Sequence, residues 1–469
     1  MVRMTVQRQR WRVLVVVALA QLMVVLDATI VNIALPAAQA DLGFGDADRQ
    51  WVVTAYSLAF GSLLLAGGRL NDRFGARTGF IVGLTGFAAA SALGGWAPGF
   101  AVLVAARAAQ GVFAALLAPA ALSLLSTTFR GNGDEGRAFG VYGAVAGGGG
   151  AIGLLLGGVL TDVLSWRWCL FVNVVLAAAV IAGARTALPA NVRTTAQRTD
   201  WWGTGLVVAG LFALVLGFGR SEVLGWTSPE TLGSLALGLG LLVAFGFVEV
   251  RTATPLLPPS ILRSRTRGTS YLVMLLAAAG MFSMYLFLAY YLQRTLGFSP
   301  VLAGVAFLPM AVSVAVGSAA SGAALVPRFG IRLPVTTGSA LAAAGFLYLT
   351  GIGAEAAYAS AVLPGLLMAG LGLGAVFGST MGSAAAGVPP AQAGIASATV
   401  NTTQQIGGSV GIALLTNLSL AASGEIAGYH AAFWGAAAAL TAAAVVAGVL
   451  YPPPSRTTTA ERRYQEEKS

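Results

Sequence analysis

The chain carries the stretch Gly67-Gly-Arg-Leu-Asn-Asp-Arg-Phe-Gly-Ala-Arg77, a short basic segment between two long apolar runs. A second copy, Gly322-Ala-Ala-Leu-Val-Pro-Arg-Phe-Gly-Ile-Arg332, shares Arg-Phe-Gly-x-Arg with the first. One such turn fits a loop of any membrane protein. Two copies at corresponding places indicate that a helical bundle was duplicated. Internal repeats of this kind are typical of membrane transporters that rock one half against the other.

The composition is that of a membrane protein. Of the 469 residues, 57% are hydrophobic and 9% are charged, whereas a soluble globular protein carries roughly 25% charged residues. Apolar runs of about 20 residues, long enough to cross a hydrocarbon core, recur from Val13 to Leu450. We therefore predict an all-α, polytopic membrane protein with about fourteen spans. No cleaved signal peptide is expected, because the first run is long and further runs follow it.

The net charge of +10 reflects basic residues that set the orientation of the chain in the membrane, and it does not indicate a nucleic-acid partner. Basic residues gather at the N-terminus, in alternate loops and in the tail. The loops on the other side of the membrane hold only Arg49, Arg167, Arg220 and Arg294. This asymmetry follows the positive-inside rule and predicts that both termini are cytoplasmic.

The spacing of the two copies also predicts the organisation of the chain. The first copy follows the second apolar run and the second copy follows the tenth, so two more spans lie between them than a plain duplication of six helices gives. We predict two six-helix bundles, residues 13–187 and 268–451, with an inserted helix pair at 201–249. The remaining segments are a cytoplasmic N-terminus, two cytoplasmic linkers and a cytoplasmic tail: 1–12, 188–200, 250–267 and 452–469.

Two opposite charges are predicted at matching depth in the N-terminal half. Asp27 lies in the first span, about 13 Å below its end at Pro36, and Arg107 lies about 12 Å inside the fourth span, which starts near Gly99. A carboxylate at this depth is costly and normally faces a cavity or a partner. One interpretation is a structural ion pair between the two spans. The other is a proton-coupling pair, in which the buried Asp27 binds and releases a proton under the control of Arg107.

The first basic segment predicts a conformational latch at the cytoplasmic face. We expect Asp72 to pair with Arg73 and Arg77 or to cap the start of the third span. The alternative is an ordinary solvated loop. Pro327 replaces the aspartate in the second copy, so the latch is expected to involve only the N-terminal half. The candidate latch residues are Gly68, Asp72, Arg73, Gly75, Arg77 and Arg137.

Polar and aromatic side chains within the spans predict a substrate cavity, because polar segments at membrane depth are tolerated only against protein or water. For each polar residue, an interhelical hydrogen bond is an equally good interpretation. The aromatic residues are also compatible with core packing, which is the more common role of such a stripe. The candidate cavity residues are Gln21, Asn32, Tyr56, Gln110, Phe282, Tyr285, Asn401 and Gln404.

Other classes of protein fit the sequence poorly. A single cysteine and a single histidine exclude an intrachain disulfide and a Cys/His metal cluster. The glycine-rich run Gly143–Gly158 lacks the Gly-Lys-Ser/Thr ending of a phosphate loop and instead predicts close helix packing. We expect no cofactor, and the energy source is expected to be an ion gradient or the gradient of the substrate itself. One deep aspartate does not supply the constellation of a membrane enzyme, and the duplication argues against a sensor that only binds.

Several motifs resemble those of the major facilitator superfamily and, within it, the fourteen-helix drug:proton antiporters. The first span is similar to that subfamily's signature, here Leu26-Asp-Ala-Thr-Ile-Val-Asn-Ile-Ala-Leu-Pro36. Gly68–Arg77 resembles the superfamily's loop motif, and Arg107-Ala-Ala-Gln-Gly111 resembles the span-four motif assigned to proton transfer. In the fifth span, Gly153, Gly157 and Gly158 resemble the antiporter motif, with Leu154 in place of the usual proline. Trp166-Arg-Trp168, with Phe171 and Asn173, is also similar to this subfamily.

The resemblance covers the whole chain and implies a multi-pass antiporter of the bacterial inner membrane. It implies that a hydrophobic or cationic drug leaves the cytoplasm by alternating access while protons enter, with Asp27 as the coupling carboxylate. We expect substrate and proton to compete at Asp27. The expected partners are the small-molecule substrate, protons and the lipid bilayer, and the chain is expected to be a monomer. The alternative within transport is a dedicated exporter of one endogenous metabolite, such as the cell's own antibiotic or an amino acid.

Overall fold

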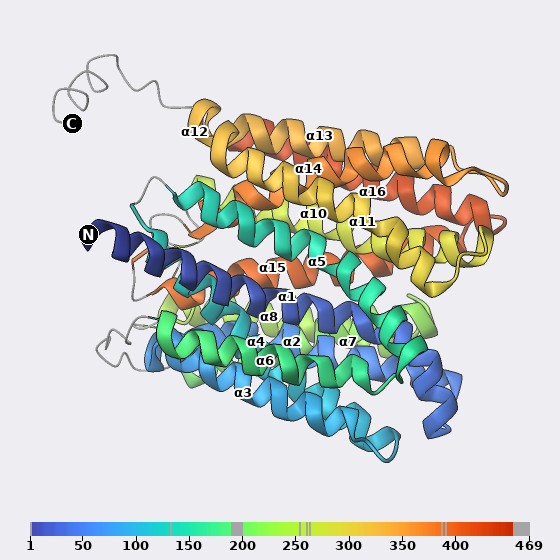
Figure 1. The fold of residues 1–469 in the computed structure, drawn as a ribbon, viewed down its shortest axis with the longest axis horizontal. Helices are drawn as coiled ribbons and strands as arrows, with labels where there is room; N and C mark the ends of the chain where they lie inside the picture. Colours follow the sequence, from blue (N-terminus) through green and yellow to red (C-terminus); the bar gives the residue numbers. More distant parts are fainter. Residues whose placement is uncertain are drawn as a thin grey trace.

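The computed structural model describes residues 2–131, 134–188, 200–252, 255–258, 261, 264–385, 388–389 and 392–453. Every regular element in this part of the chain is a helix, and the long helices run side by side (Figure 1). The long helices are α1 (Val2–Leu42), α2 (Asp46–Phe74), α3 (Ala76–Gly95), α4 (Phe100–Phe129), α5 (Glu135–Val163), α6 (Trp168–Ala187), α7 (Trp201–Leu224), α8 (Pro229–Arg251), α10 (Arg265–Tyr290), α11 (Pro300–Ala320), α13 (Arg332–Leu349), α14 (Leu363–Ala385), α15 (Ala393–Leu420) and α16 (Glu425–Leu450). The short elements are η1 (Tyr291–Thr295), η2 (Ser321–Leu325), α12 (Val326–Phe329) and η3 (Tyr358–Val362).

Twelve helices in the described residues are long and apolar enough to cross a membrane. α13 and α15 are also long but more polar, because α13 begins with Arg332 and α15 contains Asn401-Thr-Thr-Gln-Gln405. The all-α membrane fold is therefore confirmed. That α13 and α15 also cross the membrane, which would give the expected fourteen spans, stays a prediction.

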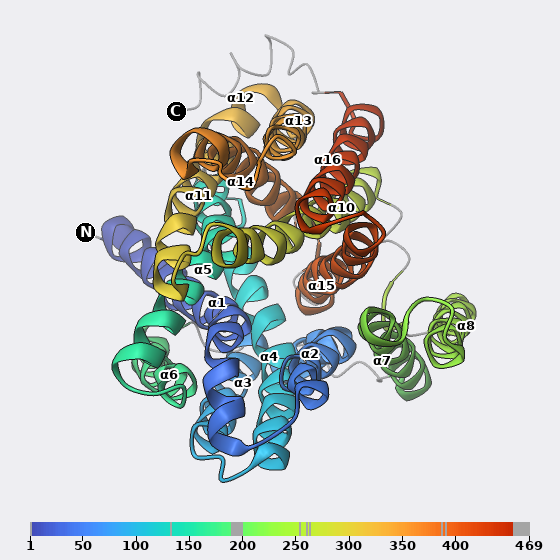
Figure 2. The ribbon, with the colours of Figure 1, turned by 90° about the vertical axis from the view of Figure 1, so that its right-hand side faces the viewer.

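The helices form two bundles that meet along their length. In the end-on view, α1–α6 make up one group and α10–α16 the other (Figure 2). In the first bundle α4 packs on α2 and α3, and in the second α13 packs on α14 and α16. The bundles meet where α5 packs on α11 and α14, and where α15 packs on α2 and α4. This arrangement is the one expected from a duplicated bundle.

Two boundaries differ from the predicted ones. α1 continues through Pro36 to Leu42. The first basic segment is helical up to Phe74 rather than a loop, and the chain turns only at Gly75, with φ 89°. The second copy ends α12 and turns at Gly330, with φ 70°. A positive φ favours glycine because it has no Cβ, so both copies of the segment turn at the same position.

The inserted pair, α7 and α8, lies beside the two bundles on the side of α2 and α15 (Figure 2). α7 packs against both of these helices, whereas α8 packs mainly on α7. The outer face of α8 exposes Leu239, Val243 and Phe247, as expected of a surface that faces lipid chains. The predicted linker 188–200 and the predicted tail fall largely outside the described residues, whereas most of the predicted linker 250–267 is described and contains the start of α10 at Arg265.

The two ends of the bundle are distinguished by the chain termini. The start of α1 and the end of α16 lie at the same end (Figure 1), here named the terminal end; the opposite one is the far end. At the terminal end Arg265 Nε of α10 donates a hydrogen bond to the Leu450 carbonyl at 2.7 Å. Termini on one side agree with an even number of spans.

Candidate functional site

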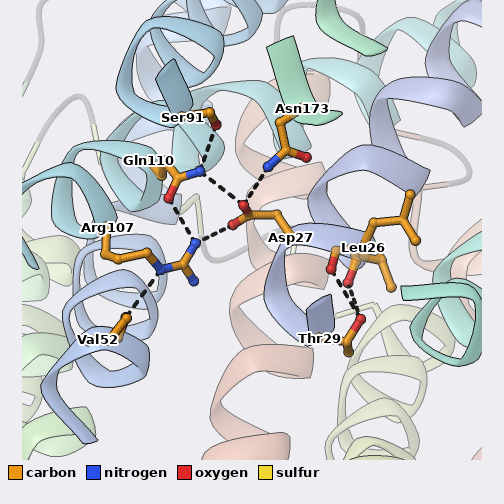
Figure 3. A network of polar contacts seen from close by, with 9 residues as sticks. Leu26, Asp27, Thr29, Val52, Ser91, Arg107, Gln110 and Asn173 are labelled. Atoms are coloured by element: carbon orange, nitrogen blue, oxygen red, sulfur yellow. Dashed lines mark hydrogen bonds and ion pairs between the residues drawn. The ribbon is translucent and has the colours of Figure 1, made fainter. Parts of the chain in front are cut away.

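A buried polar cluster lies inside the N-terminal bundle, where α1, α3, α4 and α6 converge on Asp27 (Figure 3). Arg107 Nη1 lies 2.6 Å from one carboxylate oxygen of Asp27. Gln110 Nε2 and Asn173 Nδ2 donate to the other oxygen at 2.9 and 2.7 Å. The side chains of Asp27 and Arg107 are 0% and 1% exposed. Charges buried to this extent require a partner, because an isolated ion in the protein interior is very costly.

The guanidinium of Arg107 is held from several directions. Its Nε donates to the Val52 carbonyl of α2 at 3.1 Å, and its Nη1 donates to Gln110 Oε1 at 2.8 Å. The guanidinium carbon lies 4.5 Å over the ring of Tyr56. Gln110 also reaches Ser91 Oγ of α3 at 2.6 Å. Five helices therefore contribute to one network, and a change in the charge of the carboxylate affects contacts on all of them.

The two charges predicted at matching depth are thus in direct contact. Gln110 and Tyr56, predicted to line a substrate cavity, belong to the buried cluster instead. Asn173 entered the sequence argument only through a resemblance, and Ser91 did not enter it. A single amide or hydroxyl within a span gives no indication of which neighbour it contacts, so the residue types alone could not predict the contacts of these two.

The glycines of the predicted antiporter motif place α5 directly against α1. A Cβ added at Gly153 would lie 2.0 Å from Thr29 Oγ1, and one at Gly157 would lie 2.9 Å from a carbonyl oxygen of α1. A Cβ at Gly158 would lie 3.0 Å from a side chain of α11. α5 therefore contacts both the turn of α1 that follows Asp27 (Figure 3) and the C-terminal bundle.

The second predicted site lies at the terminal end, between the two bundles. The two carboxylate oxygens of Asp72 accept hydrogen bonds from the backbone N–H groups of Gly394 and Ile395 at 2.8 and 3.1 Å. These residues open α15, so the carboxylate caps that helix and lies at the positive end of its dipole. A Cβ at Gly68 would lie 2.7 Å from the Gly394 carbonyl oxygen. The backbones of α2 and α15 are therefore in contact beside the cap.

This geometry corrects the predicted latch. The cap is on α15 of the C-terminal bundle, whereas α3 has no side-chain cap. The contacts of Asp72 therefore join both halves, whereas the prediction confined them to the N-terminal one. The sequence could not predict this because the partners of Asp72 are backbone N–H groups, which every residue type supplies. Arg137 forms an exposed ion pair with Asp134 at 3.5 Å, while Arg73 and Arg77 flank the turn between α2 and α3.

A cavity of about 580 Å³ lies between the bundles at the far end. It is lined by α2, α10, α15 and α16 together with α7 of the inserted pair. Its wall combines hydroxyl, aromatic and charged side chains: Thr54, Ser57, Ser409, Thr416, Phe218, Phe287, Tyr290, Tyr429, Arg294 and Glu425. The part played by α7 was not predicted, because the sequence gives no contact for an inserted hairpin.

Among the described residues, none of the predicted cavity residues lines this cavity. Two of them connect helices instead. Tyr285 of α10 donates to the Gly147 carbonyl of α5 at 2.6 Å, and Gln21 of α1 accepts from the hydroxyl of Tyr142 of α5 at 2.8 Å. In this conformation Tyr285 and Gln21 therefore form interhelical hydrogen bonds, which was the alternative interpretation of these residues.

The remaining candidates lie on α15 and beside it. Phe282 packs on the backbone of Gly408, where an added Cβ would lie 2.8 Å from the ring. Asn401 donates to a carbonyl of its own helix at 2.9 Å. Gln404 is half-buried, and no hydrogen bond of its amide is found in the described part of the chain. The side chain of Asn32 lies outside the described residues.

A second cluster ties the N-terminal bundle together at the far end. Asp41 accepts hydrogen bonds from Arg167 Nη1 and, at 3.1 Å, from Trp166 Nε1. Arg167 Nη2 also donates to the Ala97 carbonyl at 3.2 Å. The hydrogen bond from Arg167 holds the pKa of Asp41 below its ordinary value. The predicted Trp-Arg-Trp motif thus joins the end of α1 to the α3–α4 turn and the start of α6.

Two inward-facing charges, small residues between packed helices and a cavity between two bundles define a membrane transporter rather than an enzyme. The sequence profile of the Major Facilitator Superfamily matches residues 17–412, and the chain belongs to that superfamily.

Its relatives are bacterial resistance and export proteins. It is 50% identical over 425 residues to the puromycin resistance protein pur8 of Streptomyces alboniger, covering 90% of this chain and 84% of that protein. It is 40% identical to the cephamycin export protein CmcT of Amycolatopsis lactamdurans, covering 87% and 84%. It is 35% identical to the tetracenomycin C resistance and export protein of Streptomyces glaucescens, covering 89% and 77%.

The fold also matches a solved transporter. The crystal structure of the human organic anion transporter MFSD10 (TETRAN) superimposes with a TM-score of 0.66, covering 93% of this chain and 99% of that one. The two sequences are 17% identical, so the likeness concerns the fold alone.

Proposed function

We propose that this chain is a proton-coupled antiporter that exports antibiotic-like small molecules from bacterial cells by alternating access. The observation that carries the proposal is the buried Asp27–Arg107 pair, which lies in a chain 50% identical to a puromycin resistance protein. A carboxylate that is ionised against one guanidinium and two amides loses its strongest partner when it takes up a proton. Proton binding at Asp27 therefore has a direct effect on how α1, α2 and α4 pack.

The conformation described here corresponds to one half of the cycle. We assign the terminal end to the cytoplasm, because the basic residues of the sequence gather there. The Asp72 cap on α15 then closes the cytoplasmic side, and the cavity at the far end is the exit for substrate. The inward-open state requires that α15 leave Asp72 and that the Gly68–Gly394 contact separate.

Coupling acts through the helices in this proposal. Direct competition between substrate and proton at Asp27 was expected from the sequence, but Asp27 is fully buried and does not line the described cavity. We propose instead that protonation of Asp27 frees the guanidinium of Arg107. The resulting shift of α1 is passed to α5 through the contact at Gly153, and from α5 to the C-terminal bundle. A ligand or a proton shifts the equilibrium between the inward-open and outward-open states only by the difference in its affinity for these two states.

A dedicated exporter of one antibiotic is the second candidate. It is favoured by the names of three similar relatives, each of which refers to a single compound or compound class. A susceptibility panel in an efflux-deficient bacterial host separates the two. Protection against several unrelated compounds supports multidrug export, and protection against one compound class supports a dedicated exporter.

The proposed coupling is tested in proteoliposomes with an imposed proton gradient. Wild-type protein should move puromycin against its gradient, and Asp27→Asn should be inserted normally but lose gradient-driven transport. Asp134→Asn is the matched control, because it removes an acidic group from an exposed pair at the terminal end. Gradient-driven transport by Asp27→Asn at the wild-type rate would refute the coupling role.

A further inference from the structure

A groove at the terminal end lies between the first turns of α1 and the last turn of α6, outside the transport machinery described above. Its volume is about 810 Å³. Arg8, Trp11, Arg12 and Val15 line it from α1, and Gly183 lines it from α6. The side chain of Gln9 in this region donates to the Ala187 carbonyl of α6 at 2.9 Å, which holds the two helices together at the groove.

The rim of the groove is basic, and no acidic side chain among the described residues pairs with it. Arg8 and Arg12 are four residues apart on α1, so their side chains lie on the same face of the helix. Both are exposed, and neither forms an ion pair within the described residues. No acidic side chain is among the residues that line the groove. Between them Trp11 is fixed by an edge-to-face contact with Phe129, at 5.8 Å between ring centroids.

The floor of the groove is apolar and lies where the membrane boundary is expected. The apolar span of α1 begins at Gln7 and that of α6 ends at Ala187. Below the arginines the floor is formed by Val15, which is 56% exposed, and Val16. Gly183 keeps the floor open, because an added Cβ would lie 2.9 Å from Val16 Cγ2.

We propose that this groove binds an anionic phospholipid, with its phosphate between Arg8 and Arg12 and one acyl chain along Val15 and Gly183. Guanidinium groups match phosphate oxygens in geometry as well as in charge. Basic pockets between transmembrane helices at the cytoplasmic side are suited to anionic head groups, and tryptophan is favoured at that depth. A free phosphate ion uses only the rim, whereas a phospholipid uses both the rim and the apolar floor.

The test uses native mass spectrometry of the purified full-length chain in detergent. Phosphatidylglycerol and phosphatidylcholine with the same acyl chains are titrated separately. Each arginine at a membrane surface contributes roughly five-fold to the affinity for anionic lipid. Arg8→Ala and Arg12→Ala should therefore each weaken phosphatidylglycerol binding about five-fold, and the double variant about 25-fold. Arg10→Ala is the matched control, because Arg10 is on the same turn of α1 but does not line the groove. The affinity of this variant for phosphatidylglycerol should stay within about two-fold of the wild-type value.

Two further arms distinguish a bound phospholipid from a bound phosphate ion. Gly183→Leu fills the floor without changing the charge and should weaken phosphatidylglycerol binding, whereas inorganic phosphate should not displace the lipid. Equal binding of the two lipids, unchanged affinity in the double variant, or an equal loss in Arg10→Ala would overturn the proposal. Displacement by inorganic phosphate would assign the arginines to a phosphate ion instead and would also overturn it.

Discussion

Removing the charge of Asp72 tests how the terminal end is kept closed. In Asp72→Asn one side-chain oxygen remains to accept a hydrogen bond from the first turn of α15. The second acceptor becomes an NH₂ group, which faces a backbone N–H of the Gly394–Ile395 pair and cannot accept from it. The negative charge at the start of α15 is lost as well.

The magnitude follows from these contacts. A hydrogen bond to a charged group contributes about 1.5–3 kcal/mol, and a charge at a helix terminus about 0.3–1 kcal/mol. Once the terminal end opens, water hydrates both the side chain at position 72 and the N–H groups of α15. We therefore take roughly 2 kcal/mol as the net loss of stability of the closed state relative to the open state. This corresponds to a fall of about 30-fold in the ratio of closed to open molecules.

The assay measures the distance between spin labels at the terminal end. Labels at Thr127 of α4 and Leu333 of α13 report on the two bundles, and both positions are exposed. Cys169 is the only cysteine, so a Cys169→Ser background leaves the introduced pair as the only labelled sites. Asp72→Asn should add a population with a longer distance, whereas the surface control Asp134→Asn should not. Identical distance distributions in wild type and Asp72→Asn would refute the reasoning.

Three other perturbations test the packing and the charges. Arg107→Met should lower the free energy of unfolding by about 3–5 kcal/mol, because it leaves the carboxylate of Asp27 buried without its cation; thermal unfolding in detergent checks this, and wild-type stability would contradict it. Gly153→Ala should lower the free energy of unfolding by about 1–3 kcal/mol because the new methyl group clashes with Thr29. Adding Thr29→Ala to the same chain should restore most of this stability. Equal thermal unfolding midpoints for the single and the double variant would count against the close contact. The pKa of Asp41 is lowered in the folded protein, so its stabilising contribution is complete above the ordinary aspartate range and disappears as the pH falls through the lowered value. The difference in unfolding midpoint between wild type and Asp41→Asn should therefore be present at pH 7 and vanish at low pH, and a difference that does not change with pH would exclude this ion pair as its cause.

Much of the fold was predictable because lipid imposes simple requirements on a sequence. Every span needs about 20 apolar residues, so the helices are visible as apolar runs. The duplicated basic segment predicted two bundles, and its two copies turn at corresponding glycines, Gly75 and Gly330. Asp27 and Arg107 were predictable because deep charges are rare, and two of opposite sign at one depth favour a contact.

The rest of the site depends on contacts that the sequence does not encode by residue type. The partner of Asp72 is backbone, so no side-chain pattern identifies α15. Gln110 and Tyr56 are polar groups within spans, and polarity alone does not distinguish a ligand contact from a neighbour in a buried network. The cavity at the far end includes Phe218 of α7, and its contribution depends on where the inserted hairpin packs, which only the assembled structure determines.

The central claim is that the carboxylate of Asp27 carries the proton that drives export, and proton release on substrate binding tests it most directly. Purified protein in weakly buffered detergent solution is mixed with a compound that the susceptibility panel identifies as a substrate, and a pH indicator counts the protons released. The wild type should release protons on binding, whereas Asp27→Asn should bind the compound and release none. Equal release by both proteins would contradict the claim.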